Sequence, residues 1–141
     1  MSEELKTKIK RAWEEAFNQG KMDGLDELVA PNWVRHKPPF PDIVGLDALK
    51  KFITDCRTSY PDVNLTIEKV IIDGDWIASQ WTYEGTQSGV SPSTGAPPSN
   101  KHVKIRGCDM GRWENDKVVE DWNHGDWLGL MHQIGVVPKS W

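Results

Sequence analysis

The sequence predicts an α+β fold in which helices pack on one face of a curved antiparallel sheet. Apolar residues recur at helical spacing up to about residue 60, and after Pro61 the period changes to two, which is typical of strands. Asp73-Gly74 and Asn115-Asp116 each lie between two such stretches and are turn pairs found in hairpins. Helices that precede a run of strands indicate segregated layers. A sheet bent around its helices leaves a cone, whose mouth suits a small molecule.

Length and charge limit the classes of partner. The 141 residues fit one domain, 1–141, with no linker long enough to separate two. The net charge is −4, with 17 basic and 21 acidic residues mixed along the chain, which argues against binding nucleic acid or an anionic membrane. No stretch approaches the roughly 20 apolar residues of a membrane span, and the first residues lack the apolar core of a signal peptide, so we expect a cytoplasmic protein. The expected partner is a hydrophobic small molecule or a second copy of the chain.

The helical half is read from apolar stripes and stop signals. Residues 2–19 and 46–60 each carry an apolar stripe at helical spacing. Residues 23–29 are expected to form a short helix buried through its leucines. Prolines make residues 31–41 a turn-rich segment in this reading.

The sheet half contains two hairpins, a long loop and a terminal helix. Residues 85–101 hold three prolines, three glycines and four serines, and a loop of this length in a small domain is usually functional or mobile. The strands are expected over residues 63–72 and 75–84 and over 102–113 and 117–125, and the last helix over 128–134.

The last strand carries the clearest candidate chemistry. Trp122, His124 and Asp126 point to one side, because side chains alternate along a strand with period two. If that side lines a cavity, His124 and Asp126 form a proton-transfer pair. Asp126 is also well placed to cap the helix that follows, so a catalytic and a structural reading both stay open.

The register of the second hairpin decides which side chains of the preceding strand join this group. The Asn115-Asp116 turn fits a two-residue loop or a longer bulged one. We favour the bulged loop, because it groups Cys108, Met110 and Val118 on one apolar side, with Cys108 in the core. In this register the residues that share the side of Trp122 and Asp126 are Arg106, Cys108, Met110 and Arg112. Asp109 is notable as a charged residue in mid-strand.

Four strings of residues together form a family pattern: Arg35-His36-Lys37-Pro38, Gly45-Leu46-Asp47-Ala48-Leu49, the run from Arg112 to Trp122, and the run from Asp126 to Gly135. In these strings, and over nearly its whole length, the chain resembles the SnoaL-like polyketide cyclases, or predicted ester cyclases, of the NTF2-like superfamily. The resemblance implies a cone-shaped, cystatin-like α+β barrel that forms a homodimer and uses no cofactor. It also implies that Asp126 is the general acid/base of an intramolecular aldol reaction and that His36 lines the pocket. Arg112 stands near the position where the family has a histidine partner, which weakens the aldol assignment.

The expected function is therefore a cofactor-independent cyclase or isomerase acting on an enolisable, polyketide-like carbonyl compound. Asp126 would move the proton, with His36 and His124 polarising the substrate. The residues expected to contact the substrate are Trp33, Trp122, Arg112 and Met110. No metal is expected, because the four histidines show no ligand spacing. The alternatives are a non-catalytic pocket protein that binds a hydrophobic small molecule, with Asp126 as a cap, and a dimerising module whose cone is filled by its own side chains.

Overall fold

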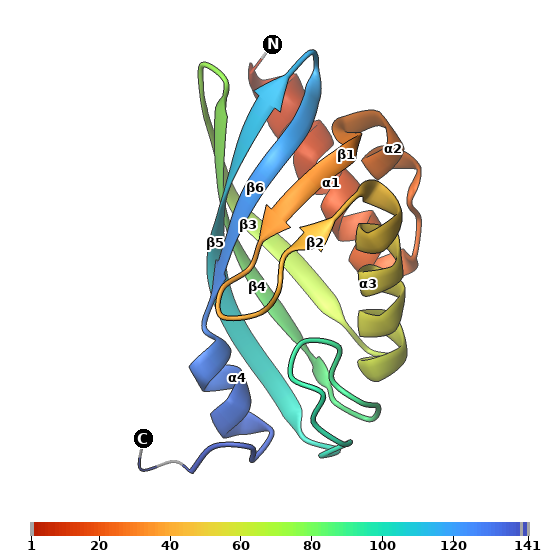
Figure 1. Cartoon of the computed structure of the whole chain (residues 1–141), viewed down its shortest axis with the longest axis vertical. Helices are drawn as coiled ribbons and strands as arrows, with labels where there is room; N and C mark the ends of the chain where they lie inside the picture. The colour runs from red at the N-terminus through yellow and green to blue at the C-terminus, as the bar shows by residue number, and fades with distance from the viewer. Residues whose placement is uncertain (1, 139, 141) are drawn as a thin grey trace.

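The structure is a computed structural model that describes residues 2–138 and 140. In that part of the chain, four helices and a six-stranded sheet make up the fold (Figure 1). The helices are α1 (Ser2–Gln19), α2 (Asp23–Leu28), α3 (Leu46–Ser59) and α4 (Trp127–Gln133). The strands are β1 (Val29–His36), β2 (Ile43–Val44), β3 (Asn64–Asp73), β4 (Trp76–Thr86), β5 (His102–Glu114) and β6 (Lys117–Gly125). The expected α+β class is confirmed.

The sheet is curved, and its strand order is β2-β1-β6-β5-β4-β3. The two expected hairpins, β3–β4 and β5–β6, are present, and β4 pairs with β5 in antiparallel fashion. The sheet is not wholly antiparallel, however, because β1 runs parallel to β6. This pairing brings a strand from the helical half against the last strand of the chain.

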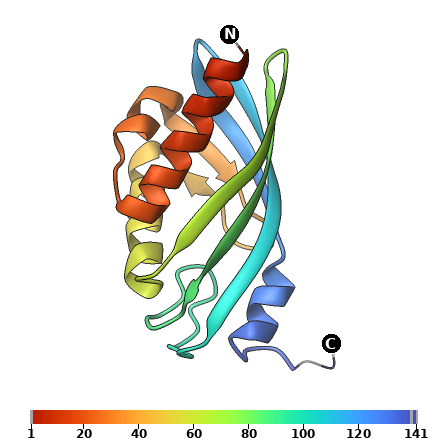
Figure 2. The same ribbon diagram turned by 180° about the vertical axis from the view of Figure 1, so that it is seen from behind.

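Helices α1, α2 and α3 cover one face of the sheet, which we call the inner face, and leave the other face open (Figures 1 and 2). The core between the layers is built from apolar side chains that helical and strand periodicity direct inward, such as Ala16, Leu49, Ile53 and Val103. α4 follows β6 and lies at one end of the sheet. Within residues 2–138 and 140, no helix is both long and apolar enough to cross a membrane.

Residues 31–41 correct the expectation of a turn-rich segment. Residues up to His36 belong to β1, and Pro31 lies where the pairing of β1 with β6 is irregular, between Val29 and Val34. Proline donates no hydrogen bond, so it is tolerated at such an interruption. His36 is thus the last residue of a strand, not part of a loop fixed by prolines.

The β5–β6 hairpin has part of the predicted side-chain grouping, since Cys108, Met110 and Arg112 share the side of Trp122, but it reaches this register by another route. Its turn is the two-residue Asn115-Asp116, with φ of 52° and 62°, and not a bulged loop. The irregularity lies further along, where Arg112 pairs with Glu120 while Trp113 pairs with Val118. The extra residue in β6 reverses the alternation there, so Val118 is buried in the core and does not join Met110. Cys108 is exposed, which corrects its placement in the core.

Candidate functional site

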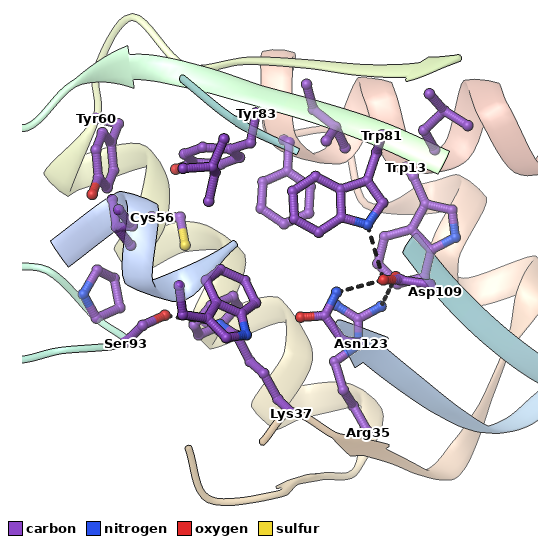
Figure 3. Close-up of a pocket in the computed structure, with 18 of the residues that line it drawn as sticks. Trp13, Arg35, Lys37, Cys56, Tyr60, Trp81, Tyr83, Ser93, Asp109 and Asn123 are labelled. Carbon is purple, nitrogen blue, oxygen red and sulfur yellow. Dashed lines mark hydrogen bonds and ion pairs between the residues drawn. The ribbon is translucent and has the colours of Figure 1, made fainter. Parts of the chain in front are cut away.

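A cavity of about 100 Å³ lies between the inner face of the sheet and the helices (Figure 3). Helices α1, α3 and α4, the sheet and the loop between β4 and β5 all contribute to its wall. Most of the wall is aromatic or aliphatic, and the aromatic side chains include Trp13, Phe17, Phe52, Tyr60, Trp81, Tyr83 and Trp127. A concave, mostly apolar site with a few polar groups is the usual form of a small-molecule site.

Asp109 of β5 is a carboxylate that lines this cavity. Its Oδ1 accepts hydrogen bonds from Trp81 Nε1 at 2.9 Å and from Asn123 Nδ2 at 2.6 Å (Figure 3). Its Oδ2 faces Arg35 Nη2 at 3.3 Å. The side chain is 18% exposed. Neighbouring strands therefore hold Asp109 in one orientation, since β4 supplies Trp81 and β6 supplies Asn123.

Arg35 of β1 is shared by two carboxylates. It makes two bonds to Asp121, from Nε at 2.7 Å and from Nη2 at 3.0 Å, and both side chains are only 6% exposed. Its guanidinium also lies over the rings of Trp13 and Trp33, at 5.0 and 5.3 Å from their centroids. Burial opposes the charge, but Asp121 and Asp109 outweigh burial and hold the pKa of Arg35 above its ordinary value.

Asp109 is the carboxylate that Arg35 neutralises less completely. Two carboxylates face one guanidinium, and Asp121 takes the closer, bidentate contact. Burial raises the pKa of Asp109, and repulsion from Asp121 adds to that rise, while Arg35, Trp81 and Asn123 oppose it. A carboxylate with a raised pKa in an apolar cavity is a suitable group to take and return a proton.

Lys37 follows β1 and places an amine in the same cavity. It is 4% exposed, and its Nζ donates a hydrogen bond to Ser93 Oγ at 2.8 Å. Three rings surround the amine, with centroids at 4.0 Å for Phe52, 4.8 Å for Trp127 and 5.6 Å for Phe40. Burial lowers the pKa of Lys37 to about 8.

Hydroxyl and indole groups complete the polar part of the wall. Burial raises the pKa of Tyr60 to about 12 and places the pKa of Tyr83 well above its ordinary value, so both phenols stay protonated near neutral pH. Tyr83 Oη and Trp127 Nε1 are buried and find no hydrogen-bond partner among the described residues. Burial also raises the pKa of Cys56 to about 12, which makes its thiol a poor nucleophile.

Asp126, the expected general acid/base, does not line the cavity. It is exposed and caps α4, and its Oδ1 accepts a hydrogen bond from the backbone N–H of Gly129 at 2.9 Å. The capping reading of the sequence is therefore confirmed. The acid/base role of Asp126 stays a prediction.

Most of the other expected site residues gather on the outer face of the sheet. His36 Nε2 lies 2.7 Å from Glu120 Oε2, and its Nδ1 lies 3.1 Å from Asp42 Oδ2. The His36 ring packs on Trp122 with centroids 5.4 Å apart. Met110 pairs with Trp122 across the strands, Arg112 pairs with Glu120, and His124 is exposed on the same face. None of these side chains reaches the cavity.

Trp33 lies on the inner side but not at the cavity. It is completely buried in the core, beneath the guanidinium of Arg35. Trp33 therefore contacts Asp109 only indirectly, through Arg35. Trp33 does not line the cavity, and the contact with substrate expected for it stays a prediction.

Sequence reasoning missed the side chains that do meet at the cavity: Arg35, Lys37, Trp81, Asp109 and Asn123. One signal was present, namely a charged residue in the middle of β5 flanked by apolar positions. A charge at such a position needs a buried partner. The partner, Arg35, lies in β1, which was not predicted as a strand because the segment contains prolines.

No group of three or more histidine, cysteine or acidic side chains suited to a metal ion occurs in the described part of the chain. The acidic side chains nearest the cavity, Asp109 and Asp121, are both engaged by Arg35.

Comparison with known proteins places the chain in a family. A model of the family described as SnoaL-like polyketide cyclase matches residues 7–134. The chain belongs to the SnoaL-like polyketide cyclase family. A comparison with curated proteins finds no match.

Solved structures agree with this fold. TsrD from Streptomyces laurentii is 23% identical, with a TM-score of 0.82 over 94% of this chain and 96% of that chain. IdmH from Streptomyces antibioticus, a candidate polyketide cyclase, is 25% identical, with a TM-score of 0.69 over 92% and 97%. A protein of ketosteroid isomerase-like fold from Catenulispora acidiphila, solved in complex with trimethylamine, is 17% identical, with a TM-score of 0.70 over 93% and 94%. These likenesses support the NTF2-like architecture of this SnoaL-like protein.

Proposed function

We propose that this SnoaL-like protein is a cofactor-independent cyclase or isomerase that acts on an enolisable, polyketide-like carbonyl compound, with Asp109 as its general acid/base. The observation that carries the proposal is a partly buried carboxylate in an aromatic cavity that shares its cation with Asp121. Family membership favours this class of reaction. We also expect the protein to be cytoplasmic.

The chemistry needs only one proton carrier. Asp109 takes a proton from the carbon next to a carbonyl group, which leaves an enolate in the cavity. In a cyclisation, the enolate carbon attacks a second carbonyl of the same molecule, and protonated Asp109 returns the proton to the new alkoxide. In an isomerisation, the proton returns at another carbon. Either way Asp109 ends in its starting state.

The neighbours of Asp109 give it the rigidity that proton transfer requires. Trp81 and Asn123 both donate to Oδ1, which leaves Oδ2 with the single long contact to Arg35. Oδ2 is therefore the oxygen that we assign to the proton. A fixed base and an aromatic wall that orients a flat substrate together reduce the entropy lost on reaching the transition state.

Hydrogen–deuterium exchange tests the proposal without knowledge of the natural substrate. Ethyl benzoylacetate, an aromatic β-keto ester, is incubated with protein in D₂O, and loss of its α-proton signal is followed by NMR. Exchange above the buffer rate is expected with the wild type. D109N should lower the catalysed rate about 10²–10⁴-fold, which is the usual contribution of a positioned base. An unchanged rate in D109N would remove Asp109 from the reaction.

A pocket protein that binds a hydrophobic small molecule without turning it over is the second candidate. The aromatic wall of the cavity favours it, and every polar contact of Asp109 can also be read as structural. Binding of ethyl benzoylacetate, seen as quenching of tryptophan fluorescence, with no catalysed exchange would support this function over catalysis.

We further propose that the outer face of the sheet forms a homodimer interface. Trp76, Met110 and Ile71 are exposed there, and the ring of Trp76 packs against that of Trp122 with centroids 5.8 Å apart. Apolar side chains clustered on an open sheet face are typical of an interface. M110R should convert a dimer to a monomer in size-exclusion chromatography with light scattering. A wild-type monomer would contradict the assignment.

A further inference from the structure

Lys37 is a buried cation whose charge has no carboxylate partner within the described part of the chain. The hydrogen bond from Nζ goes to the hydroxyl of Ser93, a neutral acceptor. The two nearby carboxylates, Asp109 and Asp121, are engaged by Arg35 instead. A buried charge is costly unless it is paired, so the unpaired amine of Lys37 lowers the stability of the fold. Stabilisation of the fold therefore does not explain why a lysine occupies this position.

Around Lys37, the residues that the structure describes supply hydrogen-bond donors and aromatic rings, but no carboxylate that is free to pair with its charge. The Nζ of Lys37 has three N–H groups, and one of them donates a hydrogen bond to Ser93 Oγ. Trp127, whose ring lies 4.8 Å from Nζ, also has a buried indole N–H without a described partner. Unused donors next to a cation suit an oxygen-rich, negatively charged group.

The rings around Lys37 define the rest of the ligand. Phe52 and Trp127 flank the amine closely, and both line the cavity. A flat, apolar body can stack on these rings while its anionic oxygen reaches Nζ. Strand alternation explains the placement, because Arg35 and Lys37 are successive inward-facing residues of one segment, separated by outward-facing His36.

We propose that Lys37, with the indole N–H of Trp127, forms a binding site for the anionic oxygen of a flat carbonyl compound, either a carboxylate or an enolate. The cavity then has a cationic site at Lys37 and a carboxylate base at Asp109. This inference deepens the proposed function by naming the substrate class as acidic carbonyl compounds. The anion site itself does not require that Asp109 catalyse any reaction.

Two matched ligands test the anion site by binding alone. Benzoate and benzamide have nearly the same shape and differ in charge, and their affinities at pH 7 are measured by tryptophan fluorescence and isothermal titration calorimetry. The wild type should prefer benzoate. A charge-assisted hydrogen bond contributes about 1.5–3 kcal/mol, so K37M should weaken benzoate binding about 10- to 100-fold. Benzamide affinity should change less than about twofold, because methionine preserves the length and apolar stem of lysine.

An exposed lysine provides the control variant. Lys69 lies on β3, and K69M makes the same chemical change at the surface, so it should leave both affinities unchanged. K37Q, which can still bond Ser93, replaces K37M if circular dichroism shows that K37M is unfolded. Equal binding of the two ligands to the wild type, equal losses of both in K37M, or a matching loss in K69M would each overturn the site.

The D109N variant separates this inference from the proposed function. It should retain the preference for benzoate while losing proton exchange. If exchange survives in D109N but benzoate selectivity still depends on Lys37, the base assignment fails and the anion site stands. If exchange depends on Asp109 but K37M binds benzoate normally, the anion site fails and the base assignment stands.

Discussion

The two faces of the β5–β6 hairpin carry similar residues and behave differently. On the inner face, Asp109 and Asp121 meet Arg35 under the helices, where the side chains of Arg35 and Asp121 are 6% exposed. On the outer face, Glu120 meets His36 and Arg112, whose side chains are 31% and 37% exposed. Ion pairs near water contribute little to stability, whereas buried ones strongly affect both pKa and stability. One step along β6 therefore separates the partly exposed salt bridge of Glu120 from the buried ion pair of Asp121.

The largest stability difference should come from removing an arginine on each face. R35M leaves Asp121 buried without a cation, and breaking a buried pair in this way costs about 3–5 kcal/mol of unfolding free energy. R112M breaks only partly exposed contacts with Glu114 and Glu120, so its unfolding free energy should stay close to that of the wild type. Urea denaturation followed by circular dichroism compares them. Similar losses in both variants would show that burial does not distinguish the two faces.

Lys37 should have the opposite effect to Arg35, because it is buried without an ion-pair partner. K37M should raise the unfolding free energy at pH 7 by on the order of 2 kcal/mol, since lowering the pKa by one unit corresponds to about 1.4 kcal/mol. The contacts of Nζ with the rings of Phe52, Trp127 and Phe40 offset part of that cost. The pKa of Lys37 is lowered from 10.5 to about 8. Between those values the unfolded wild type binds more protons than the folded one, so wild-type stability rises with pH and the advantage of K37M shrinks. A gap that stays constant from pH 7 to pH 10 would contradict the lowered pKa.

Asp126 should affect stability modestly and chemistry little. D126A removes the hydrogen bond to Gly129 at the start of α4, and the loss of such a cap costs about 1 kcal/mol. The thermal midpoint should fall by a few degrees, with ligand affinity unchanged. A variant with wild-type stability would mean that the cap contributes nothing to the fold.

His36 should have the smallest effect, visible only in its dependence on pH. The hydrogen bond to Glu120, followed by that to Asp42, raises the pKa of His36, while burial opposes the rise. The stabilisation is complete below the ordinary pKa of histidine and is lost as pH rises through the folded value. The stability difference between wild type and H36Q, at most about 1 kcal/mol for a partly exposed pair, should therefore be greater at pH 6 than at pH 8. A difference that grows with pH has the wrong sign for this pairing.

Periodicity predicted the four helices, the two hairpins and the grouping of Met110 and Arg112 with Trp122, but it missed β1 and β2. It could not say which side of β6 faces the helices. The placement of Val118 depends on one extra residue in the strand, a feature that alternation cannot reveal. The family resemblance drew attention to His36 and Asp126, while the carboxylate in the cavity is Asp109.

The missed residues share one cause, which is long-range pairing. Arg35 approaches Asp121 because β1 lies parallel to β6, although 86 positions separate the two residues in sequence. Lys37 reaches Ser93 across 56 positions. Local patterns identify strands and helices, but the partner of a buried charge depends on which strands become neighbours. Asp109 was recognisable as unusual from the sequence, but its function depended on Arg35.

The most direct test compares proton exchange by D109N and D126N with the same substrate, ethyl benzoylacetate, at pH 7. If the inner face provides the base, D109N loses about 10²–10⁴-fold of the catalysed rate and D126N keeps it within a small factor. If D126N loses the activity while D109N keeps it, the exposed carboxylate at the start of α4 is the base, and the assignment to the inner face is wrong.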